Sequence, residues 1–370
     1  MEMLTNKADD VRPLSDQRTA NKNLLSEYTY YHGMVPPQDV PELLEKDGDF
    51  LLRKEQVKKG LLIAVLSVRC DDVVKHFIIN KSDKGEYYIE NLRAKTIEDL
   101  VQSHLKSGEP LSKASQARLK RAVPRQEWML NHEDIIFREC VGQRNPDSVE
   151  EYVGEFVYNN VTRPVFLKTV GITCSRNVRA RVMKEARLLR SLRHPNVGEI
   201  YGVALHYSPI ILVLEYFSKS LHTHLKQNAG QISEEDRRRF ITEAAAGFAY
   251  LAENGCIHRD ISAKICKLSD ALEVKISGFS LCENTKEMHE SNNIQIAVKW
   301  QAPEVLKGGN FSLKSDVWSF GILMWEVYND GAEPYAGMTP SVVKSMILED
   351  DYKMPVPQAS LQLNGNQEKA

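Results

Sequence analysis

The sequence predicts a multidomain chain of the α+β class, and three observations support this class. The 370 residues are enough for two or three domains. Residues 48–108 combine short apolar runs with one amphipathic helical pattern, as expected for a central sheet flanked by helices. From residue 135 onward short strands come first and long helices follow, which indicates a second domain with a strand-rich lobe and a helix-rich lobe.

The composition argues against several functions. Apolar residues make up 42% of the chain, charged residues 26%, and the net charge is −2. This balance provides no bulk attraction to nucleic acid or to an acidic membrane, so we expect no nucleic-acid partner. The longest apolar runs, 61–68 and 320–328, are too short to span a bilayer, so we expect no direct membrane insertion.

The cysteines and the N-terminus indicate a cytoplasmic protein. The six cysteines are scattered and form no CxxC pair, which is typical of reduced thiols rather than of a disulfide or zinc framework. The first residues contain no apolar signal-peptide core. Residues 1–27 are polar and without pattern, and they predict a disordered tail.

Four strands are expected in the first domain. Residues 48–55 and 61–69 read as strands, and the second is apolar on both faces, which places it centrally in a sheet. Residues 75–81 and 86–92 suggest two more strands around a turn at 83–85.

One helix closes the first domain. Thr96 can cap this helix, Asp99 occupies the capping-box position, and Gly108 can end it. The first domain is therefore expected over residues 28–123, followed by a linker at 124–134.

The second domain is expected over residues 135–354, with a disordered tail at 355–370. Its strand-rich lobe would end near residue 216 and its helix-rich lobe would cover about 217–354. The expected strands are 163–168 and 210–216, and the expected helices are 178–192, 234–255 and 315–328.

An arginine in an apolar strand is the first candidate for a binding residue. Arg53 lies in the run "GDFLLRKE", and a buried guanidinium needs an anionic partner. That partner is either an internal carboxylate or a ligand. A phosphate suits the planar fork of arginine because it accepts two hydrogen bonds at once.

The motifs around this arginine resemble those of an SH2 domain. They are "YYHGMVP", "GDFLLR", "KHFII" and the helix followed by "EPLSK", in that order and spacing. The resemblance implies the SH2 fold, a central antiparallel sheet flanked by two helices, and binding of tyrosine-phosphorylated proteins or peptides. By position, Arg53 would clamp the phosphate, His76 would support it, and Lys58 and Lys59 would add positive charge.

Two residues depart from that pattern. Pro37 stands where the family usually offers a second arginine, just after "HGxxP". Glu55 follows in the loop that usually carries Ser or Thr, and it would repel phosphate unless it turns away. A purely structural Arg53 therefore stays as the alternative.

The second region resembles a protein kinase. Lys168 ends a strand, Glu185 lies on the next helix, and "HRD" (258–260), "VKWQAPE" (298–304) and "SDVWSFG" (315–321) follow in order. The motifs lean toward tyrosine kinases, and an SH2 domain directly upstream resembles the Fer/Fes group of non-receptor tyrosine kinases. The resemblance implies ATP and Mg²⁺ as cofactors, Lys168 and Glu185 as the ion pair of the ATP site, and Asp260 as the proton acceptor.

The metal ligands of that family are replaced. Gly278 stands for the metal-binding Asp of "DFG", and Ile265 stands for the catalytic-loop Asn. Neither side chain offers an oxygen, and Mg²⁺ requires oxygen ligands. We therefore expect no metal site and no bound cofactor.

The nucleotide-binding residues are altered as well. Of the phosphate-binding glycines only Gly142 is present, and Asp147, Glu150 and Glu151 add negative charge nearby. Phe166 and Lys267 occupy positions above and below the adenine, according to the resemblance.

The residues that organise the kinase fold are retained. Leu189, His258 and Phe279 match an apolar spine between the lobes, and Asp316 matches the residue that anchors the catalytic loop. We therefore interpret Lys168, Glu185 and Asp260 as structural. The helix-rich lobe is expected to be shortened, which would leave the face around Trp318 and Trp325 for a protein partner.

The preferred interpretation is a catalytically inactive pseudokinase that acts as a phosphotyrosine-binding adaptor, cytoplasmic and open to recruitment at membrane-proximal phosphotyrosine sites. One alternative is an active tyrosine kinase that transfers the ATP γ-phosphate to protein tyrosine. Another is an interaction scaffold whose SH2 domain does not bind phosphate.

Overall fold

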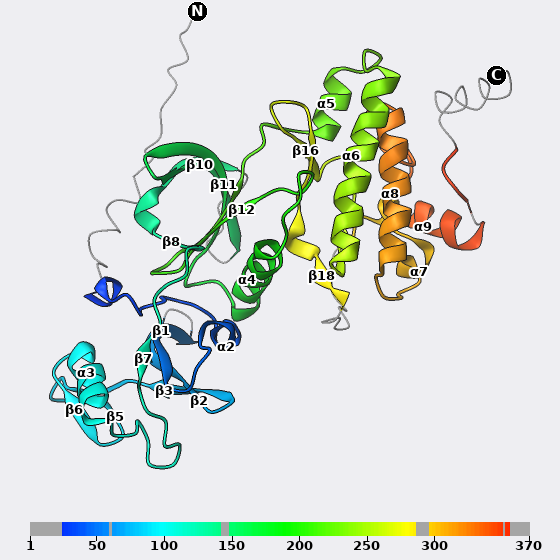
Figure 1. Cartoon of the computed structure of the whole chain (residues 1–370). Helices are drawn as coiled ribbons and strands as arrows, with labels where there is room; N and C mark the ends of the chain where they lie inside the picture. Colours follow the sequence, from blue (N-terminus) through cyan, green and yellow to red (C-terminus); the bar gives the residue numbers. More distant parts are fainter. Residues whose placement is uncertain (1–23, 59–60, 142–147, 286–295, 351, 356–370) are drawn as a thin grey trace, which may run out of the picture.

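A computed structural model describes residues 24–58, 61–141, 148–285, 296–350 and 352–355 (Figure 1). Most of the two expected tails therefore lies outside the described residues. The start of the ordered chain differs from the prediction, because Leu24–Glu27 form a short 3-10 helix, η2. The reason is local packing, since Leu25 and Tyr28 contact the apolar core of the first domain.

The first domain is built on a sheet of order β3-β2-β1-β7. Its strands are β1 (Asp49–Lys58), β2 (Leu61–Cys70), β3 (Val73–Ile78) and β7 (Arg121–Ala122). The run that is apolar on both faces, β2, lies between two neighbours as predicted, and it pairs antiparallel with β1 and β3. The short β7 pairs parallel with β1 and closes the sheet.

The structure divides the two strands predicted at residues 75–81 and 86–92 into shorter strands. After β3 the chain forms a separate small sheet of β4 (Asn80–Lys81), β5 (Tyr87–Ile89) and β6 (Leu92–Ala94). The break falls at Ile79, whose side chain turns into the core and is 7% exposed.

The helices of the first domain flank these sheets. The helix α3 (Ile97–Ser107) begins and ends as predicted, with the Thr96 hydroxyl accepting a hydrogen bond from the Asp99 N–H. The other flank carries the 3-10 helix η3 (Pro37–Asp39) and the single turn α2 (Val40–Leu43).

The strand-rich lobe of the second domain is a six-stranded sheet of order β8-β12-β13-β11-β10-β9. The long strands are β9 (Ile135–Val141), β10 (Val149–Tyr158), β11 (Val161–Val170), β12 (Ile200–Ala204) and β13 (Ile210–Glu215). The edge strand β8 (Met129–Leu130) comes from the predicted linker and pairs parallel with β12. The 3-10 helix η4 (His132–Asp134) follows it. The linker is thus part of this sheet.

Helix α4 (Arg176–Arg190) packs against the strand-rich lobe. Further helices form the other lobe, where α6 and α8 lie side by side (Figure 1). These helices are α5 (Leu221–Gln227), α6 (Glu234–Glu253), α7 (Pro303–Leu306), α8 (Leu313–Tyr328) and α9 (Pro340–Glu349). The predicted apolar face of α6 is confirmed, since Phe240, Ala244 and Leu251 are each 1% exposed.

Short strands and 3-10 turns lie between these helices along the chain. They are β14 (Lys219–Ser220), β15 (Cys256–Ile257), β16 (Cys266–Leu268), β17 (Val274–Ile276), η5 (Phe279–Leu281), β18 (Glu283–Asn284) and η7 (Val298–Trp300). In the parts of the chain that were described, no helix is both long and apolar enough to cross a membrane.

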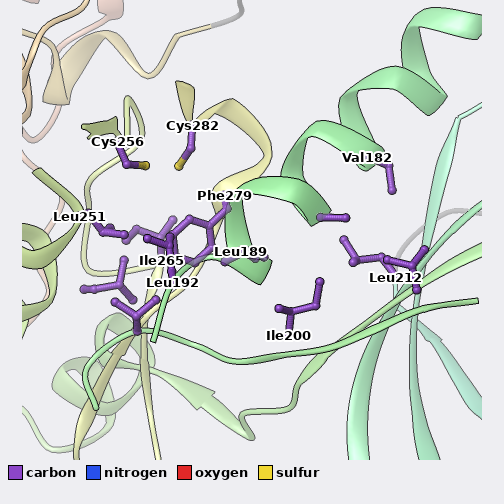
Figure 2. Packing of buried hydrophobic residues seen from close by; sticks show 14 of the residues in the cluster. Val182, Leu189, Leu192, Ile200, Leu212, Leu251, Cys256, Ile265, Phe279 and Cys282 are labelled. Carbon is purple, nitrogen blue, oxygen red and sulfur yellow. The ribbon is translucent and has the colours of Figure 1, made fainter. Parts of the chain in front are cut away.

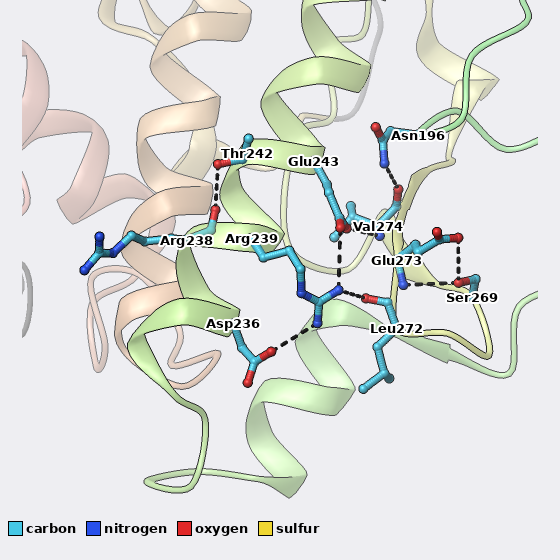
Figure 3. A network of polar contacts seen from close by, with 10 residues as sticks. All are labelled: Asn196, Asp236, Arg238, Arg239, Thr242, Glu243, Ser269, Leu272, Glu273 and Val274. Carbon is cyan, nitrogen blue, oxygen red and sulfur yellow. Dashed lines mark hydrogen bonds and ion pairs between the residues drawn. The ribbon is translucent and has the colours of Figure 1, made fainter.

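The hairpin of β16 and β17 is tied to α6 by polar contacts (Figure 3). Arg239 donates a hydrogen bond to the carbonyl of Leu272 at 2.9 Å, and Glu243 accepts one from the N–H of Val274 at 2.7 Å. Asn196 holds the same strand from the other side through the Val274 carbonyl at 2.9 Å. These contacts fix the hairpin that lies between Ile265 and Gly278.

The two domains are packed together. The N–H of Met34 donates to the carbonyl of Leu205 at 2.8 Å, and Asp39 pairs with Arg187 at 2.7 Å. Gly33 has a φ of +61°, and a Cβ atom there would lie 2.0 Å from the Leu205 carbonyl oxygen. Only glycine permits both this conformation and this approach. The first domain is therefore held against the strand-rich lobe, next to α4.

Candidate functional site

Arg53 lies at the centre of the first candidate site. Strand β1 buries it to 1% exposure, where Nε donates to the hydroxyl of Ser67 at 3.0 Å and Nη2 donates to Glu55 at 2.7 Å. Its third nitrogen, Nη1, is buried and has no hydrogen-bond partner among the described atoms. Burial lowers the pKa of Arg53, and Glu55 acts in the opposite direction. A buried donor left unmatched in this way is costly unless a ligand satisfies it.

His76 supports Arg53 through an intermediate residue. The ring Nδ1 of His76 lies 2.9 Å from the Ser67 hydroxyl, which in turn accepts from Arg53. Burial lowers the pKa of His76, as does the charge of Arg53, while Glu55 acts in the opposite direction. Sequence reasoning missed Ser67, although a serine in the apolar run of β2 was the available signal. Strand register places it directly opposite His76.

Glu55 does not turn away from the site. Its carboxylate pairs with Nη2 of Arg53 and remains 30% exposed at the side chain. It thus holds one of the two parallel donors that a phosphate would use, and a ligand must compete with it.

A cavity of about 260 Å³ opens beside Arg53. Its wall on the first domain includes Pro37, Lys54 and Glu55, and its opposite wall comes from α4, through Arg176 and Arg179 among others. The predicted residue Lys58 does not line this cavity but the neighbouring hollow, together with Gln56 and the start of α4. Lys59 lies outside the described residues.

The second candidate site is the cleft between the lobes of the second domain. There Lys168 on β11 and Glu185 on α4 form an ion pair at 2.7 Å with side chains 8% and 4% exposed. The structure thus brings this predicted pair together. Ser280, which the sequence analysis did not select, accepts from Lys168 at 2.9 Å and donates to the second Glu185 oxygen at 3.3 Å. The pair is therefore satisfied within the protein.

The turn that carries Asp260 is held from below, as predicted. Asp316 accepts hydrogen bonds from the N–H groups of His258 and Arg259 at 2.6 and 3.0 Å. Burial raises the pKa of Asp316 to about 6. Arg259 keeps a φ of +71°, an uncommon backbone conformation that persists because its surroundings hold it.

The predicted spine is also assembled. The rings of His258 and Phe279 lie 5.5 Å apart, and Phe279 packs in one cluster with Leu189 (Figure 2). Burial lowers the pKa of His258 to about 4, so this ring is a neutral core residue. Ile265 joins the same cluster and is 9% exposed (Figure 2).

The two replaced metal positions contact one another. Gly278 has a φ of +80°, and a Cβ atom there would lie 3.0 Å from Cγ2 of Ile265. An apolar contact therefore occupies the place where oxygen ligands would be needed. Asp260 lines the cleft together with Ile265 and Gly278, and burial raises its pKa while Lys264 opposes that change. Within the described ranges no three His, Cys, Asp or Glu side chains come together, so these residues do not fit a Mg²⁺ ion.

Phe166 and Lys267 do not fill the cleft between the lobes. Phe166 and Lys267 both line it as expected, yet a cavity of about 460 Å³ remains, within the usual range of about 300–1,000 Å³ for ligand sites. Phe166 therefore narrows the cleft without filling it, because its side chain shares the lining with the opposite lobe. Burial lowers the pKa of Lys267.

The acidic residues near the phosphate loop are only partly described. Gly142 and Asp147 lie outside the described residues. Of the others, Glu151 lines the cavity, whereas Glu150 accepts a hydrogen bond from the Tyr152 hydroxyl at 2.9 Å.

The face around Trp318 and Trp325 is hollowed. Both indoles line a groove of about 440 Å³, next to Val317, which is 70% exposed. Helix α9 covers part of this face, because Trp318 also packs against the cluster that contains Val343. The face expected for a protein partner is thus a groove rather than an uncovered surface.

Comparison with known proteins gives two family matches. The family "SH2 domain" matches residues 30–104, and the family "Protein tyrosine and serine/threonine kinase" matches residues 137–364. The second match covers more than half of the chain. Both matches follow the predicted order.

Three relatives agree with these matches. The chain is 39% identical to Fer-related kinase 1 of Caenorhabditis elegans, over 89% of this chain and 84% of that protein. It is 36% identical to the transforming protein Fps of avian sarcoma virus, over 87% of this chain and 60% of the relative. It is 34% identical to human tyrosine-protein kinase Fer, over 93% of this chain but only 41% of human Fer.

Proposed function

Because this chain belongs to the Fer/Fes-type family of tyrosine kinases with an SH2 domain, we propose that it binds phosphotyrosine and lacks kinase activity of its own. It would act as an adaptor for tyrosine-phosphorylated proteins. The chain spans less than half of human Fer. The activity proposed here is therefore a proposal for this chain alone.

One observation carries the binding half of the proposal: the unmatched Nη1 of Arg53. The guanidinium is 1% exposed, is oriented by Ser67, and lines a cavity that can admit a ligand. A phosphate oxygen supplies the acceptor that this nitrogen lacks, and the contact would be charge-assisted. A guanidinium with a purely structural role would be expected to have all its donors matched.

The inactive half of the proposal rests on the contact of Ile265 with Gly278. Phosphoryl transfer needs metal ions that neutralise the charge developing on the phosphates. Neither of these side chains carries an oxygen, and among the described residues no three His, Cys, Asp or Glu side chains form a group that could hold a metal ion. Lys168 and Glu185 are satisfied by each other and by Ser280, so their presence needs no nucleotide.

An active kinase is the second candidate, and one observation favours it. Lys168 and Glu185 are paired at 2.7 Å, and the cavity beside them is large enough for a ligand. A kinase of this kind would have to position the nucleotide without the usual metal ligands. Phosphate transfer to a generic tyrosine polymer, with Asp260→Asn as the blank, distinguishes it from a pseudokinase.

Calorimetric titration of the full chain with a tyrosine peptide, phosphorylated and unphosphorylated, tests the binding half. We expect heat of binding with the phosphorylated form alone. Equal affinity for both forms, or none for either, would instead support a scaffold whose SH2 domain does not read phosphate. The Arg53–Glu55 pair is the observation on which that rival depends.

A further inference from the structure

The cavity beside Arg53 is short of positive charge on its SH2 side. A phosphotyrosine carries a charge of about −1.5 to −2 at pH 7. Against it the SH2 domain sets two cations, Arg53 and Lys54, and the charge of Arg53 is already matched by Glu55. Pro37 lines the same cavity and carries no charge. A phosphate dianion in this cavity needs further cations.

The opposite wall supplies them. Arg176 and Arg179 lie three residues apart at the start of α4, on one face of the helix, and both line the cavity that contains Arg53. Among the described lining residues, Glu55 is the one carboxylate. Two cations of the kinase domain therefore line the same cavity as Lys54 and as Arg53, which has an unmatched donor.

Among the described residues, neither Arg176 nor Arg179 forms an ion pair with an acidic side chain. Burial lowers the pKa of Arg179; the neighbouring Cys174 opposes this change and the charge of Arg176 adds to it. No acidic side chain lies in the first turn of this 15-residue helix, whose amino end is positive through its dipole. Arg179 keeps one hydrogen bond, to the carbonyl of Cys174 at 3.0 Å, which positions its guanidinium.

The two walls are held at a fixed separation. Gln56 of β1 donates to the carbonyl of Ile172 at 3.0 Å, just before α4 begins. Further along the helix, Arg187 pairs with the buried Asp39 at 2.7 Å. Because these contacts lie on both sides of the cavity, Arg53 and Arg179 face the same enclosed space.

We propose that the phosphotyrosine pocket is a composite site, in which Arg179 and Arg176 of the kinase domain complete the phosphate coordination begun by Arg53. The ligand is a tyrosine-phosphorylated peptide. This inference rests on the proposed function, since it adds a second set of contacts to the same site. In the composite site, the guanidinium groups of α4 stand in for the arginine that Pro37 replaces.

The test is a calorimetric titration of the full chain with one phosphotyrosine peptide. We expect Arg176→Ala/Arg179→Ala to weaken binding by roughly 10-fold to 100-fold, as for the loss of hydrogen bonds to a charged group. Arg181→Ala is the matched control, because Arg181 is exposed on the same helix and does not line the cavity. The control should bind as the unchanged protein does.

A second control separates direct contact from domain docking. Asp39→Asn/Arg187→Gln removes a contact between the domains without leaving a buried charge and without touching the cavity. Because the contacts of Gln56 with Ile172 and of Met34 with Leu205 remain and keep the domains docked, we expect this variant to keep its affinity within about threefold, a change of less than 1 kcal/mol. If it loses as much affinity as the α4 variant, the direct contact is disproved.

The outcomes also separate this inference from the proposed function. If the unchanged protein does not bind the phosphopeptide, the proposed function itself fails. A different result is that the unchanged protein binds the peptide and Arg53→Ala abolishes this binding, but the α4 variant has the same affinity as Arg181→Ala. The SH2 domain then binds the phosphate without the arginines of α4. In that case the composite site is wrong and the proposed function stands.

Discussion

Buried charged groups are satisfied in opposite ways in two of the cavities of this protein, the one beside Arg53 and the cleft between the lobes. Beside Arg53, a guanidinium is buried with one nitrogen unmatched, and its cavity is lined by further cations. In the cleft between the lobes, Lys168 and Glu185 are equally buried but satisfy each other and Ser280. An unmatched buried donor costs about 1–3 kcal/mol, so it is expected to persist where a ligand uses it. A matched pair needs no ligand.

The positions at which family residues are replaced also differ between these two cavities. In the cleft, Ile265 and Gly278 contact one another and extend the apolar core around Phe279. Beside Arg53, Pro37 removes a cation from one wall, while α4 presents two from the other. In our proposal, the first change removes metal binding from a well-packed region, whereas the second is compensated by α4 across the domain boundary. Whether a residue of the family is retained therefore indicates less about function than the hydrogen-bond partners that the residue has in the structure.

Among the variants that test this comparison, Arg53→Ala is expected to have the largest effect on binding. We expect this substitution to abolish phosphopeptide binding, at a loss on the order of 2–5 kcal/mol, because a charge-assisted bidentate contact disappears. Titration calorimetry measures the loss, and thermal unfolding checks that the variant folds. Arg93→Ala, an exposed arginine of the same domain, is the control. Unchanged affinity in folded Arg53→Ala would show that Arg53 is structural and does not bind the phosphate.

A smaller effect is expected at Gly278. The substitution Gly278→Ala places a Cβ atom 3.0 Å from Ile265 at a φ of +80°. The matched control is Gly308→Ala, because Gly308 has a φ of +90° but nothing within 4 Å of its Cβ position. We expect Gly278→Ala to lower the free energy of unfolding by about 1–3 kcal/mol more than the control does, as overpacking does. Equal losses in chemical denaturation would show that the contact with Ile265 is loose.

The next variant removes the carboxylate of Glu55, which competes with a phosphate for Arg53 in the cavity beside it. We expect Glu55→Gln to tighten phosphopeptide binding by about 1 kcal/mol, roughly fivefold, because Arg53 no longer exchanges one anion for another. Glu109→Gln, which changes an exposed carboxylate of the same domain, should leave the affinity unchanged. Weaker binding by Glu55→Gln would mean that Glu55 positions Arg53 for the ligand.

Restoring the metal ligands is expected to have little effect. The double substitution Ile265→Asn/Gly278→Asp supplies oxygen ligands beside Asp260. Phe166 and Lys267 still narrow the cleft, and a kinase acts mainly by positioning the nucleotide, so we expect no robust transfer to a tyrosine polymer. Asp260→Asn provides the blank. Turnover at about 1 s⁻¹, as in ordinary kinases, would show that the metal ligands alone had been missing.

The smallest effect is expected from MgATP on the unchanged protein. A ligand present at 100 times its dissociation constant stabilises the folded state by about 2.7 kcal/mol. Without oxygen ligands at residues 265 and 278, we expect no Mg²⁺-dependent rise in the melting temperature. Thermal unfolding with ATP, with and without Mg²⁺, measures this. A metal-dependent rise would contradict the interpretation of the cleft.

Much of the secondary structure could be predicted because it depends on local patterns. The cap of Thr96 on α3 and the apolar face of α6 follow from spacing along a few turns of helix. The central position of β2 follows from a run that is apolar on both faces. The break at Ile79 could not be predicted, because it depends on which side chain the assembled core admits.

The candidate site residues also divide into those that a sequence motif identifies and those that only the fold brings to the site. Arg53, Lys168, Glu185 and Asp260 were identified from motifs. Ser67 and Ser280 were not, since a serine in a strand or turn has no distinctive pattern until strand register or lobe closure brings it to a charged group. The orientation of Glu55 was left open for the same reason, because it depends on the geometry of one strand relative to the buried guanidinium.

The sequence by itself determined the family, the order of the domains and the loss of metal-ligand side chains at residues 265 and 278, because these are matters of residue type and spacing. The tertiary structure alone decided what those losses mean. It placed Ile265 against Gly278, satisfied Lys168 with Ser280, and brought Arg179 to the cavity of Arg53 across 126 positions of chain, from 53 to 179. Contacts between distant segments depend on how whole elements pack, which no local pattern encodes.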